Sequence, residues 1–293
     1  IAVDLEQYDY TAGSEALIRA TEGTVVERIP PRKKIRINAP IELPHIMLLF
    51  DDKQNKIIGD LYAKRDKLEK LYDFELNMDG GHLTGYKVTD TDEVIKQFRK
   101  ILGGAKMMFA VGDGNHSLAT AKACWDTVKQ NLTDEQRAVH PARFALVEAV
   151  NIYDEGLQFE PIHRVVFNAS DELAAEIKAI GGTSVCELYR NGKTEKLMLP
   201  ANSVEAVKAV QDVIDRYVKA PGSNMKVDYI HGLGNVREIV NEHPDSMGLT
   251  LPAFDKSLLF GYVEHKGTLP RKTFSMGEAV EKRYYLEAKL IRL

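Results

Sequence analysis

The sequence predicts an α+β (mixed α/β) fold in two domains. Helical and strand patterns alternate along the chain, hairpins interrupt the alternation, and the 293 residues exceed one domain of roughly 150 residues. The hydrophobic fraction of 44% and the charged fraction of 28% are typical of a globular protein. We expect residues 1–167 to form a phosphate- or nucleotide-binding region and residues 168–293 to form a second α/β domain.

The first half of the chain alternates short helical and strand patterns. A helix is expected at residues 14–20, a break at Pro30-Pro31, a strand at 43–50, a helix at 59–71, and a hairpin of strands 72–77 and 83–88. Asp90 or Thr91 caps a helix that ends at Leu102, and Thr133 caps a shorter helix. Between these helices we expect a strand at 106–111 and a helix at 115–130, followed by strands at 143–152 and 159–167.

Beyond Asn168 the pattern starts again. Ser170 caps a helix to Ile180, and strands 184–189 and 195–199 flank the hairpin turn Asn191-Gly192. A helix at 204–217, a strand at 226–230, a helix around 255–263 and a last strand near 283–292 complete the expected order.

Composition excludes several classes of protein. The net charge of −4 gives no overall field that favours DNA or an anionic membrane. No run is long enough to span a bilayer. Cys124 and Cys186 lie in different expected domains, which argues against a disulfide framework and a zinc site and suits the cytoplasm. The chain starts at Ile1 rather than Met, so we expect that an N-terminal segment is missing; a homo-oligomer is compatible with the sequence.

The most informative segment is Phe109-Ala-Val-Gly-Asp-Gly-Asn-His-Ser117, an apolar run that breaks into a turn and opens a helix. Glycines at such a junction let a ligand approach the backbone, and the helix start offers N–H groups and the positive end of a dipole. Gly112, Gly114, Asn115 and Ser117 are therefore candidate phosphate-binding residues.

Two side chains of this turn are candidates for chemistry. Asp113 is expected to hold Mg²⁺ or to orient a hydroxyl, and His116 is expected to donate a hydrogen bond or to move a proton. The alternative is a tight turn whose polar residues satisfy backbone donors. The letters Gly114-Asn-His116 also occur in metallophosphoesterases, but the further histidine ligands of those enzymes are not evident here.

A basic segment lies between Arg19 and Arg36. If residues 32–37 are extended, Arg32, Lys34 and Arg36 share one face, and this basic stripe could neutralise a polyphosphate. Arg19, Arg28 and Arg32 are the candidate phosphate- or nucleotide-binding residues of the segment. The alternative is a solvated edge strand whose charges block aggregation. Glu22 near these cations is a candidate general base.

Three further motifs carry candidate phosphate ligands. His163 and Arg164 interrupt an apolar strand, with a buried histidine and a snorkelling arginine as the alternative. His231-Gly-Leu-Gly-Asn235 echoes the first turn but has Arg237 where a dinucleotide fingerprint needs glycine. Lys272, in Pro270-Arg-Lys-Thr273, lacks the glycine-rich loop of a P-loop.

Four separated blocks resemble one protein family. Ala20-Thr-Glu-Gly-Thr24, Asp113-Gly-Asn-His-Ser117, Pro161-Ile-His-Arg164 and Pro270-Arg-Lys-Thr273 resemble the domain-of-unknown-function 1015 family, in the right order and over nearly the whole chain. The resemblance implies a ParB/sulfiredoxin-like core, whose members bind nucleotides such as ATP, ADP or CTP. These members include partition proteins, sulfiredoxins and a free-serine kinase.

In that superfamily a conserved box at a helix start corresponds to Gly114–Ser117. The reactive cysteine of sulfiredoxin falls on Asn115, so sulfinic-acid repair is excluded. The usual arginine of the box falls on Ser117, which removes a guanidinium that would pair with phosphate.

Three hypotheses follow. The first is an enzyme that transfers phosphoryl from a nucleotide to a small hydroxylated metabolite, with Mg²⁺ on Asp113 and with Glu22 or His116 as the base. The second is a non-catalytic module that senses a nucleotide or another phosphorylated small molecule. The third and weakest is a partition-protein relative that acts on DNA, which the acidic net charge disfavours.

Overall fold

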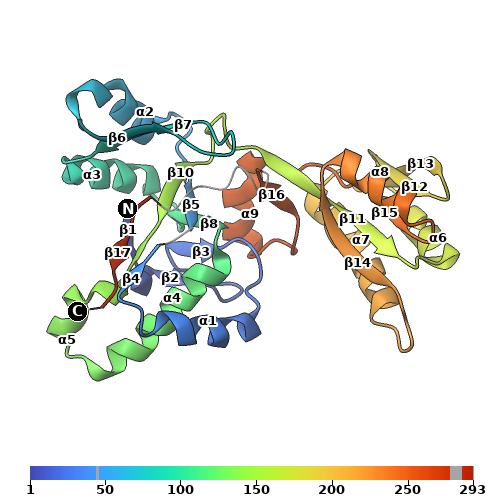
Figure 1. The fold of residues 1–293 in the computed structure, drawn as a ribbon, viewed down its shortest axis with the longest axis horizontal. Helices are drawn as coiled ribbons and strands as arrows, with labels where there is room; N and C mark the ends of the chain where they lie inside the picture. The colour runs from blue at the N-terminus through green and yellow to red at the C-terminus, as the bar shows by residue number, and fades with distance from the viewer. Residues whose placement is uncertain (44–45, 278–285, 293) are drawn as a thin grey trace. The chain divides into compact units, whose positions relative to one another are not determined.

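The computed structural model describes residues 1–43, 46–277 and 286–292 (Figure 1). Its contacts divide the chain into two compact units. The first unit comprises residues 1–157, 256–268 and 279–293, and the second comprises 158–255 and 269–278. Both contain helices and sheets, so the expected α+β class is confirmed. The assignment of separate roles to residues 1–167 and 168–293 stays a prediction.

The first unit is built around a mixed sheet with the strand order β10-β5-β8-β3-β2. The pairs β10–β5, β8–β3 and β3–β2 are parallel, whereas β5–β8 is antiparallel. Three two-stranded pairs, β1–β9, β6–β7 and β4–β17, complete the unit. Its strands are β1 (Ala2–Asp4), β2 (Tyr8–Asp9), β3 (Ile18–Ala20), β4 (Ile41–Glu42), β5 (Met47–Phe50), β6 (Glu69–Glu75), β7 (His82–Lys87), β8 (Phe109–Asp113), β9 (Phe144–Leu146), β10 (Glu148–Asn151) and β17 (Lys289–Leu290).

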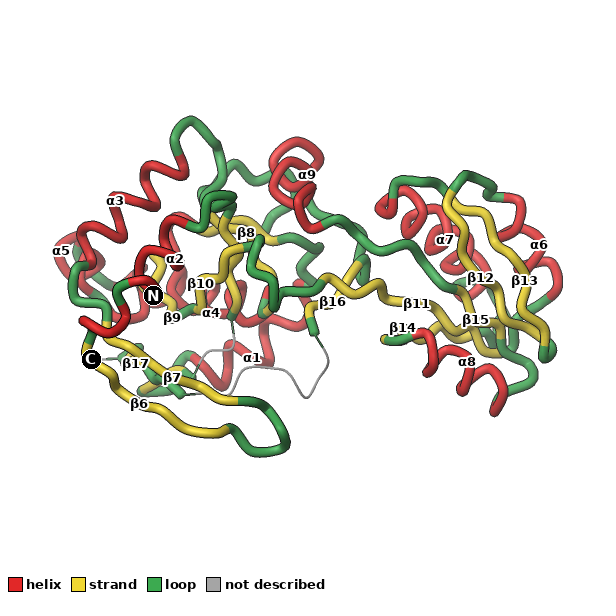
Figure 2. The backbone as a smooth tube through the Cα atoms, turned by 90° about the horizontal axis from the view of Figure 1, so that it is seen from above, coloured by secondary structure: helices red, strands yellow, loops and turns green. Residues whose placement is uncertain are grey.

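Helices pack around this sheet (Figure 2). Leu118, Ala121 and Trp125 of α4 bury their side chains against Val111 and Leu48 of the sheet, in a stripe with helical spacing. The helices of the unit are α1 (Ile29–Arg36), α2 (Lys56–Ala63), α3 (Thr91–Leu102), α4 (Asn115–Val128), α5 (Asp134–Val139) and α9 (Leu259–Lys266).

Two expectations for the N-terminal region were wrong. The helix expected at residues 14–20 is absent, because Ile18–Ala20 form β3 and pair with β2 and β8. Pro30-Pro31 do not break the chain but lie in the first turn of α1. The N–H groups of a first helical turn have no acceptor within the helix, so the missing N–H of proline costs no hydrogen bond there. Residues 32–36 are therefore helical rather than extended, so Arg32 and Arg36 share one helix face and Lys34 lies on another.

The second unit is an antiparallel sheet of order β13-β12-β15-β11-β14, with β16 paired to the beginning of β11. Its long strand β11 (Phe159–Phe167) lies between β15 and β14, and a strand is expected here from the apolar run. The other elements are β12 (Ser184–Arg190), β13 (Lys193–Leu199), β14 (Lys226–His231), β15 (Met247–Leu249), β16 (Phe274–Met276), α6 (Asp171–Ala179), α7 (Ser203–Val218) and α8 (Leu233–Glu242).

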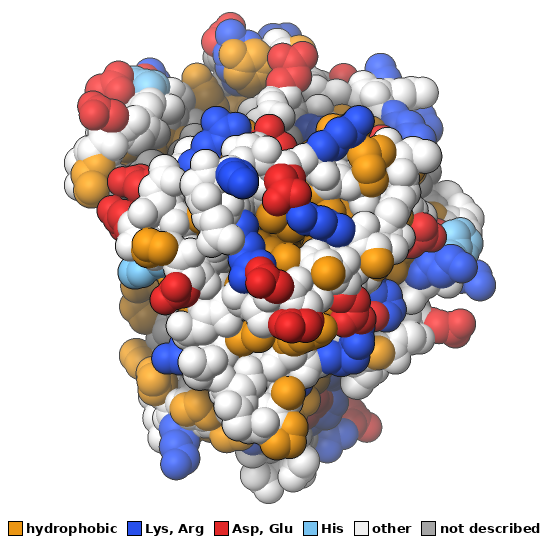
Figure 3. Space-filling view, turned by 90° about the vertical axis from the view of Figure 1, so that its right-hand side faces the viewer, with side chains coloured by type: hydrophobic (Ala, Val, Ile, Leu, Met, Phe, Trp, Pro, Cys, Tyr) orange, Lys and Arg blue, Asp and Glu red, His pale blue; other side chains and the backbone are white. Residues whose placement is uncertain are grey.

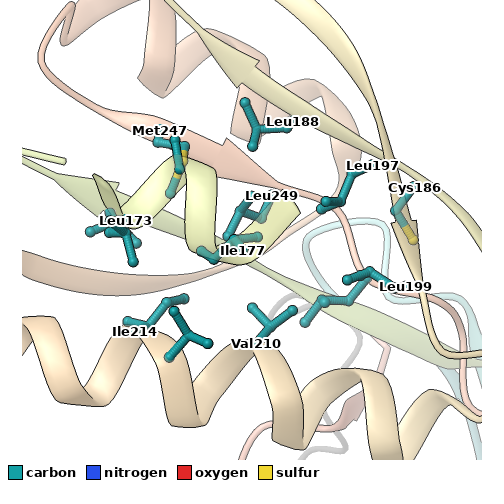
Figure 4. Close-up of a cluster of buried hydrophobic side chains, with 14 of the residues drawn as sticks. Leu173, Ile177, Cys186, Leu188, Leu197, Leu199, Val210, Ile214, Met247 and Leu249 are labelled. Atoms are coloured by element: carbon teal, nitrogen blue, oxygen red, sulfur yellow. The ribbon is translucent and has the colours of Figure 1, made fainter. Parts of the chain in front are cut away.

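Its two sheet faces are covered by different helices. Leu173 and Ile177 of α6 and Val210 and Ile214 of α7 pack on Leu249 and its neighbours in the main core (Figure 4). On the other face, Val236 and Val240 of α8 pack on Val165 and Tyr189. The strands β11, β12 and β15 therefore bury side chains on both faces.

Most other expected elements of the chain are confirmed. Asp90, Thr133 and Ser170 accept hydrogen bonds as helix caps, and the Asn191-Gly192 turn joins β12 to β13. The helix expected at 59–71 ends earlier, at Ala63, because β6 begins at Glu69. The helix expected around 255–263 begins later, at Leu259. Parts of the strands expected at 43–50 and 283–292 lie outside the described residues.

Two further features concern the surface and the cysteines. Among residues 1–43, 46–277 and 286–292, no helix has both the length and the apolar character to cross a bilayer. Cys124 and Cys186 are both buried and free. Basic and acidic side chains are interspersed over the face shown in Figure 3, so this face has no continuous field of one sign.

Candidate phosphate-binding site at the start of α4

The parallel pairing of β3 with β8 brings two loops to the same sheet edge. Ala20 is paired with Val111, so the segments that follow β3 and β8 leave the sheet next to each other. The hydroxyl of Thr21 donates a 2.6 Å hydrogen bond to the carbonyl of Val111. The backbone N–H of Val25 donates to Nε2 of His116 over 3.2 Å. The loop 21–25, which contains Glu22, is thus held against the turn 112–116.

Gly114 makes the tight turn from β8 into α4. Its φ of 88° lies in the left-handed region that glycine adopts without strain, and its N–H donates 2.8 Å to Oδ1 of Asp113. The first bond of the helix runs from the N–H of Leu118 to the carbonyl of Gly114. The N–H groups of residues 115–117 precede that bond and have no acceptor within the helix, so this end attracts anions.

Two polar atoms at this edge lack a partner. Oδ1 of Asn115 and Oγ1 of Thr24 are buried and make no hydrogen bond within the part of the chain that the structure describes. The Asn115 side chain belongs to a residue that is only 6% exposed. Buried polar atoms usually have partners, so a bound ligand or water is expected to satisfy these oxygens.

The hydrogen bond from Val25 engages one ring nitrogen of His116. Nε2 is the acceptor of the Val25 N–H, so its lone pair points at the backbone of the loop 21–25. The Nε2 lone pair is then unavailable to take a proton from a substrate. Glu22 is partly exposed, and no described residue forms a hydrogen bond or ion pair with its carboxylate.

The basic residues of α1 and of the turn before it lie at different distances along the chain from this edge. Val25 is bonded to His116 at the start of α4, and Arg28 follows Val25 by three residues. Lys33, in the second half of α1, donates a 2.6 Å hydrogen bond to the hydroxyl of Thr127 near the end of α4. The two helices therefore start at the same edge. Arg28 and Arg32 are exposed, and Arg32 donates to the carbonyl of Arg28. Arg36 instead pairs with the buried Glu42.

Arg19 points to the opposite sheet edge. Its guanidinium donates to the carbonyls of Ala16 and Lys106, both over 2.8 Å, and the residue is buried. Lys106 precedes β8, whereas Asp113 ends it. We therefore do not include Arg19 in the candidate site.

His163, Arg164 and Lys272 belong to the second unit and form a group of their own. Arg164 is fully buried; it donates to the carbonyls of Ile162 and Lys272 and to Oε1 of Gln211. Burial lowers the pKa of its guanidinium to about 10. Nδ1 of His163 accepts from the N–H of Leu251 over 3.2 Å. These side chains hold the turn around Lys272, so we also leave them out of the candidate site.

A metal site is sparse in protein ligands. Among the described residues, no group of three or more His, Cys, Asp or Glu side chains could together hold a metal ion. Mg²⁺ commonly binds one or two carboxylates and completes its shell with water and substrate phosphates. A single carboxylate such as Asp113 is compatible with that pattern and does not make a site of protein ligands alone.

Sequence reasoning missed Thr21 and the N–H of Val25, which attach the Glu22 loop to the turn. The available signal was the short block Thr21-Glu-Gly-Thr24, which combines hydroxyls with a glycine. Ser117, Gly112, Gly114, Asn115, Asp113, His116 and Glu22 do lie on one edge of the first unit. Their roles as ligands and catalysts stay predictions.

The chain belongs to a family of proteins whose function is not known. The sequence pattern of the family described as "Protein of unknown function (DUF1015)" matches residues 1–228, which is most of the chain. None of the curated proteins matches it in sequence.

Several solved structures share the fold at low sequence identity. Two structures of free serine kinase, each with one glutamate substituted and in complex with AMP, cover 94% of this chain at TM-scores of 0.51 and 0.50. Their sequence identities to this chain are 10% and 11%, and the match covers 86% and 87% of the kinase chains, in the same order. SbnI with a C-terminal truncation, from Staphylococcus aureus, covers 99% of this chain and is covered over 87%, at 10% identity and a TM-score of 0.51. At these identities the likeness concerns the fold alone.

Proposed function

We propose that the turn 112–117 binds the phosphates of a nucleotide and that the protein transfers phosphoryl from it to the hydroxyl of a small metabolite. The observation that carries the proposal is the bond between Val25 and His116, which places Glu22 beside a glycine turn at a helix start. The AMP complexes of free serine kinase, which has a similar fold, support a nucleotide as the ligand.

The binding roles follow from the charges at this edge. The N–H groups at the start of α4 would hold phosphate oxygens, and Arg28 and Arg32 would reduce the negative charge. Asp113 would hold Mg²⁺, which neutralises charge that develops on the phosphates. Because Ser117 stands in place of an arginine, the backbone N–H groups and Mg²⁺ would have to stabilise more of the phosphate charge.

Glu22 is the base in this proposal. Its carboxylate would take the proton of the metabolite hydroxyl while that oxygen bonds to the terminal phosphorus and the bond to the leaving phosphate oxygen breaks. His116 acts as a positioning residue, because its Nε2 is engaged by Val25. A ParB/sulfiredoxin-like core is part of this proposal and is consistent with the helix start at Gly114–Ser117.

A sensing module is the second candidate. Ser117 at the box position favours it, because without the arginine the phosphates lose a partner that would otherwise stabilise a charged transition state. Such a protein would bind the same ligand at the same turn and would not turn it over.

Calorimetry and turnover assays on three variants test these roles. We would titrate ATP, ADP and CTP with and without Mg²⁺, and assay transfer to hydroxylated probes that include serine. Glu22→Gln should keep nucleotide affinity within about twofold and lose 10²–10⁴-fold in turnover. Asp113→Asn should weaken the Mg²⁺-dependent part of binding, and Glu27→Gln, an exposed neighbour, should change neither.

Each outcome decides between the candidates. Binding without turnover of any probe would favour the sensing module. Unchanged turnover in Glu22→Gln would remove Glu22 as the base. Absence of binding by nucleotides and by phosphorylated metabolites alike would overturn the proposal.

A further inference from the structure

A large apolar hollow lies in the first unit, away from the turn 112–117. It measures about 820 Å³ and is walled by α2, α3 and strands of the sheet. Sixteen of its twenty lining residues are apolar. None of the residues of the candidate phosphate site lines it, so it is a separate feature.

The helix α3 shows why the hollow exists. Its apolar side chains recur at helical spacing, yet none of its residues is buried. Ile95 of α3 is 46% exposed and Ile58 of α2 is 39% exposed, and both line the hollow. On the side of α3 that faces the sheet, the ring of Phe98 packs on those of Phe50 and Phe109, with ring centroids 5.2 and 5.3 Å apart. The apolar face of α3 is therefore packed at its base and open above it.

The volume is that of a ligand site rather than of a packing defect. An apolar cavity of roughly 150 Å³ is enough to bind benzene, and small-molecule sites typically measure about 300–1,000 Å³. Aliphatic walls offer no hydrogen bonds, so they favour an apolar body of matching size.

One cation at the hollow lacks a partner. Arg99 follows Ile95 by one helical turn, and its guanidinium makes no hydrogen bond or ion pair with any residue that the structure describes. The bordering carboxylates differ in this respect: Glu287 accepts from the hydroxyl of Tyr72 over 2.8 Å, and Glu148 also has an interaction of its own.

We propose that this hollow binds a small amphiphile, an acyl carboxylate whose chain lies between α2, α3 and the sheet and whose carboxylate pairs with Arg99. An arginine fork matches a carboxylate with two parallel hydrogen bonds, which neither an alcohol nor an amine can accept. This site is independent of nucleotide binding at α4.

Displacement of the fluorescent probe 1-anilinonaphthalene-8-sulfonate tests the proposal, with decanoate, decanol and decylamine as competitors below their aggregation concentrations. Decanoate should displace the probe at a concentration about tenfold lower than decanol and lower still than decylamine. Ile95→Trp or Ile58→Trp fills the hollow and should weaken decanoate binding at least about tenfold. Ile35→Trp, on the exposed surface of α1, is the matched control and should leave it unchanged.

Arg99→Gln tests the head group, with its exposed neighbour Lys100→Gln as the control. The first substitution should abolish the preference for decanoate over decanol, and the second should preserve it. Circular dichroism would verify that every variant folds. Failure of all three competitors to displace the probe, equal binding in both filled variants, or a preference for decylamine would each overturn the proposal.

Discussion

Nε2 of His116 accepts the backbone N–H of Val25 over 3.2 Å, which joins the loop after β3 to the start of α4. This one bond links two segments that are 91 residues apart in the chain. It places the Glu22 loop at a helix end that favours anions, and it engages Nε2 of His116 as an acceptor.

Loss of this acceptor should loosen the loop. In His116→Ala the N–H of Val25 has no imidazole to bind, and its amide hydrogen should exchange at least about tenfold faster, as measured by NMR. The free energy of unfolding should fall by about 1 kcal/mol. His265→Ala, an exposed histidine of α9, is the control and should leave both quantities unchanged. Unchanged exchange at Val25 in His116→Ala would contradict the role of this bond.

Two glycine substitutions should have opposite effects on stability. Gly114→Ala forces a Cβ into a φ of 88° and should lower the free energy of unfolding by about 1–2 kcal/mol. Gly261→Ala, within α9, places its Cβ more than 4 Å from every atom outside its chain neighbours and the nearby helix backbone, and should raise it by roughly 0.5–1 kcal/mol. Urea denaturation measures both. A neutral Gly114→Ala would mean that the turn tolerates a side chain.

Arg164 should tolerate no conservative replacement. Its fork reaches Gln211, the carbonyl of Ile162 and the carbonyl of Lys272 in different directions, and one ammonium cannot replace it. Arg164→Lys should cost at least about 2 kcal/mol, because buried acceptors lose their donors. Arg216→Lys, in an exposed pair with Glu176, should cost less than about 0.5 kcal/mol in the same denaturation experiment. Equal costs would show that the buried contacts contribute little.

The buried His163 should make stability depend on pH. It is 6% exposed, and burial, then Arg164, then His231 lower its pKa below the usual 6.5. His163 therefore binds a proton more readily in the unfolded chain than in the folded protein. The free energy of unfolding should fall as the pH drops through about 6.5 toward the lower pKa of the folded state. Denaturation between pH 5 and 7 measures the slope.

Variants identify the source of that slope. His163→Asn keeps an acceptor for the N–H of Leu251 and should flatten the pH dependence, whereas His243→Asn, at an exposed position, should not. A slope that survives in His163→Asn would assign it to other groups.

Local sequence signals predicted many elements because the deciding interactions are close in the chain. The caps at Asp90, Thr133 and Ser170 act within three residues, and the turn Asn191-Gly192 fixes its own hairpin. Residues 14–20 failed because pairing with β8, about 90 residues away, overrides a helical pattern. The proline pair failed for a different reason, since a proline is equally compatible with a break and with a first helical turn.

The candidate site could be predicted in part. The glycine turn and the helix start at Asn115 are local features, and they were expected. The approach of Thr21 and Val25, and the diversion of Arg19 to the carbonyl of Lys106, depend on strand order, which no local pattern encodes.

The most direct measurement is an amide NMR titration of the isotope-labelled protein with Mg²⁺ and ATP, followed by ADP and CTP. We expect the largest chemical-shift changes at Gly114, Asn115 and His116, with Val25 and Glu22 next, and smaller changes in Gly114→Ala. Chemical-shift changes at other residues, with no change at these five amides, would contradict the proposal that the start of α4 is the phosphate site.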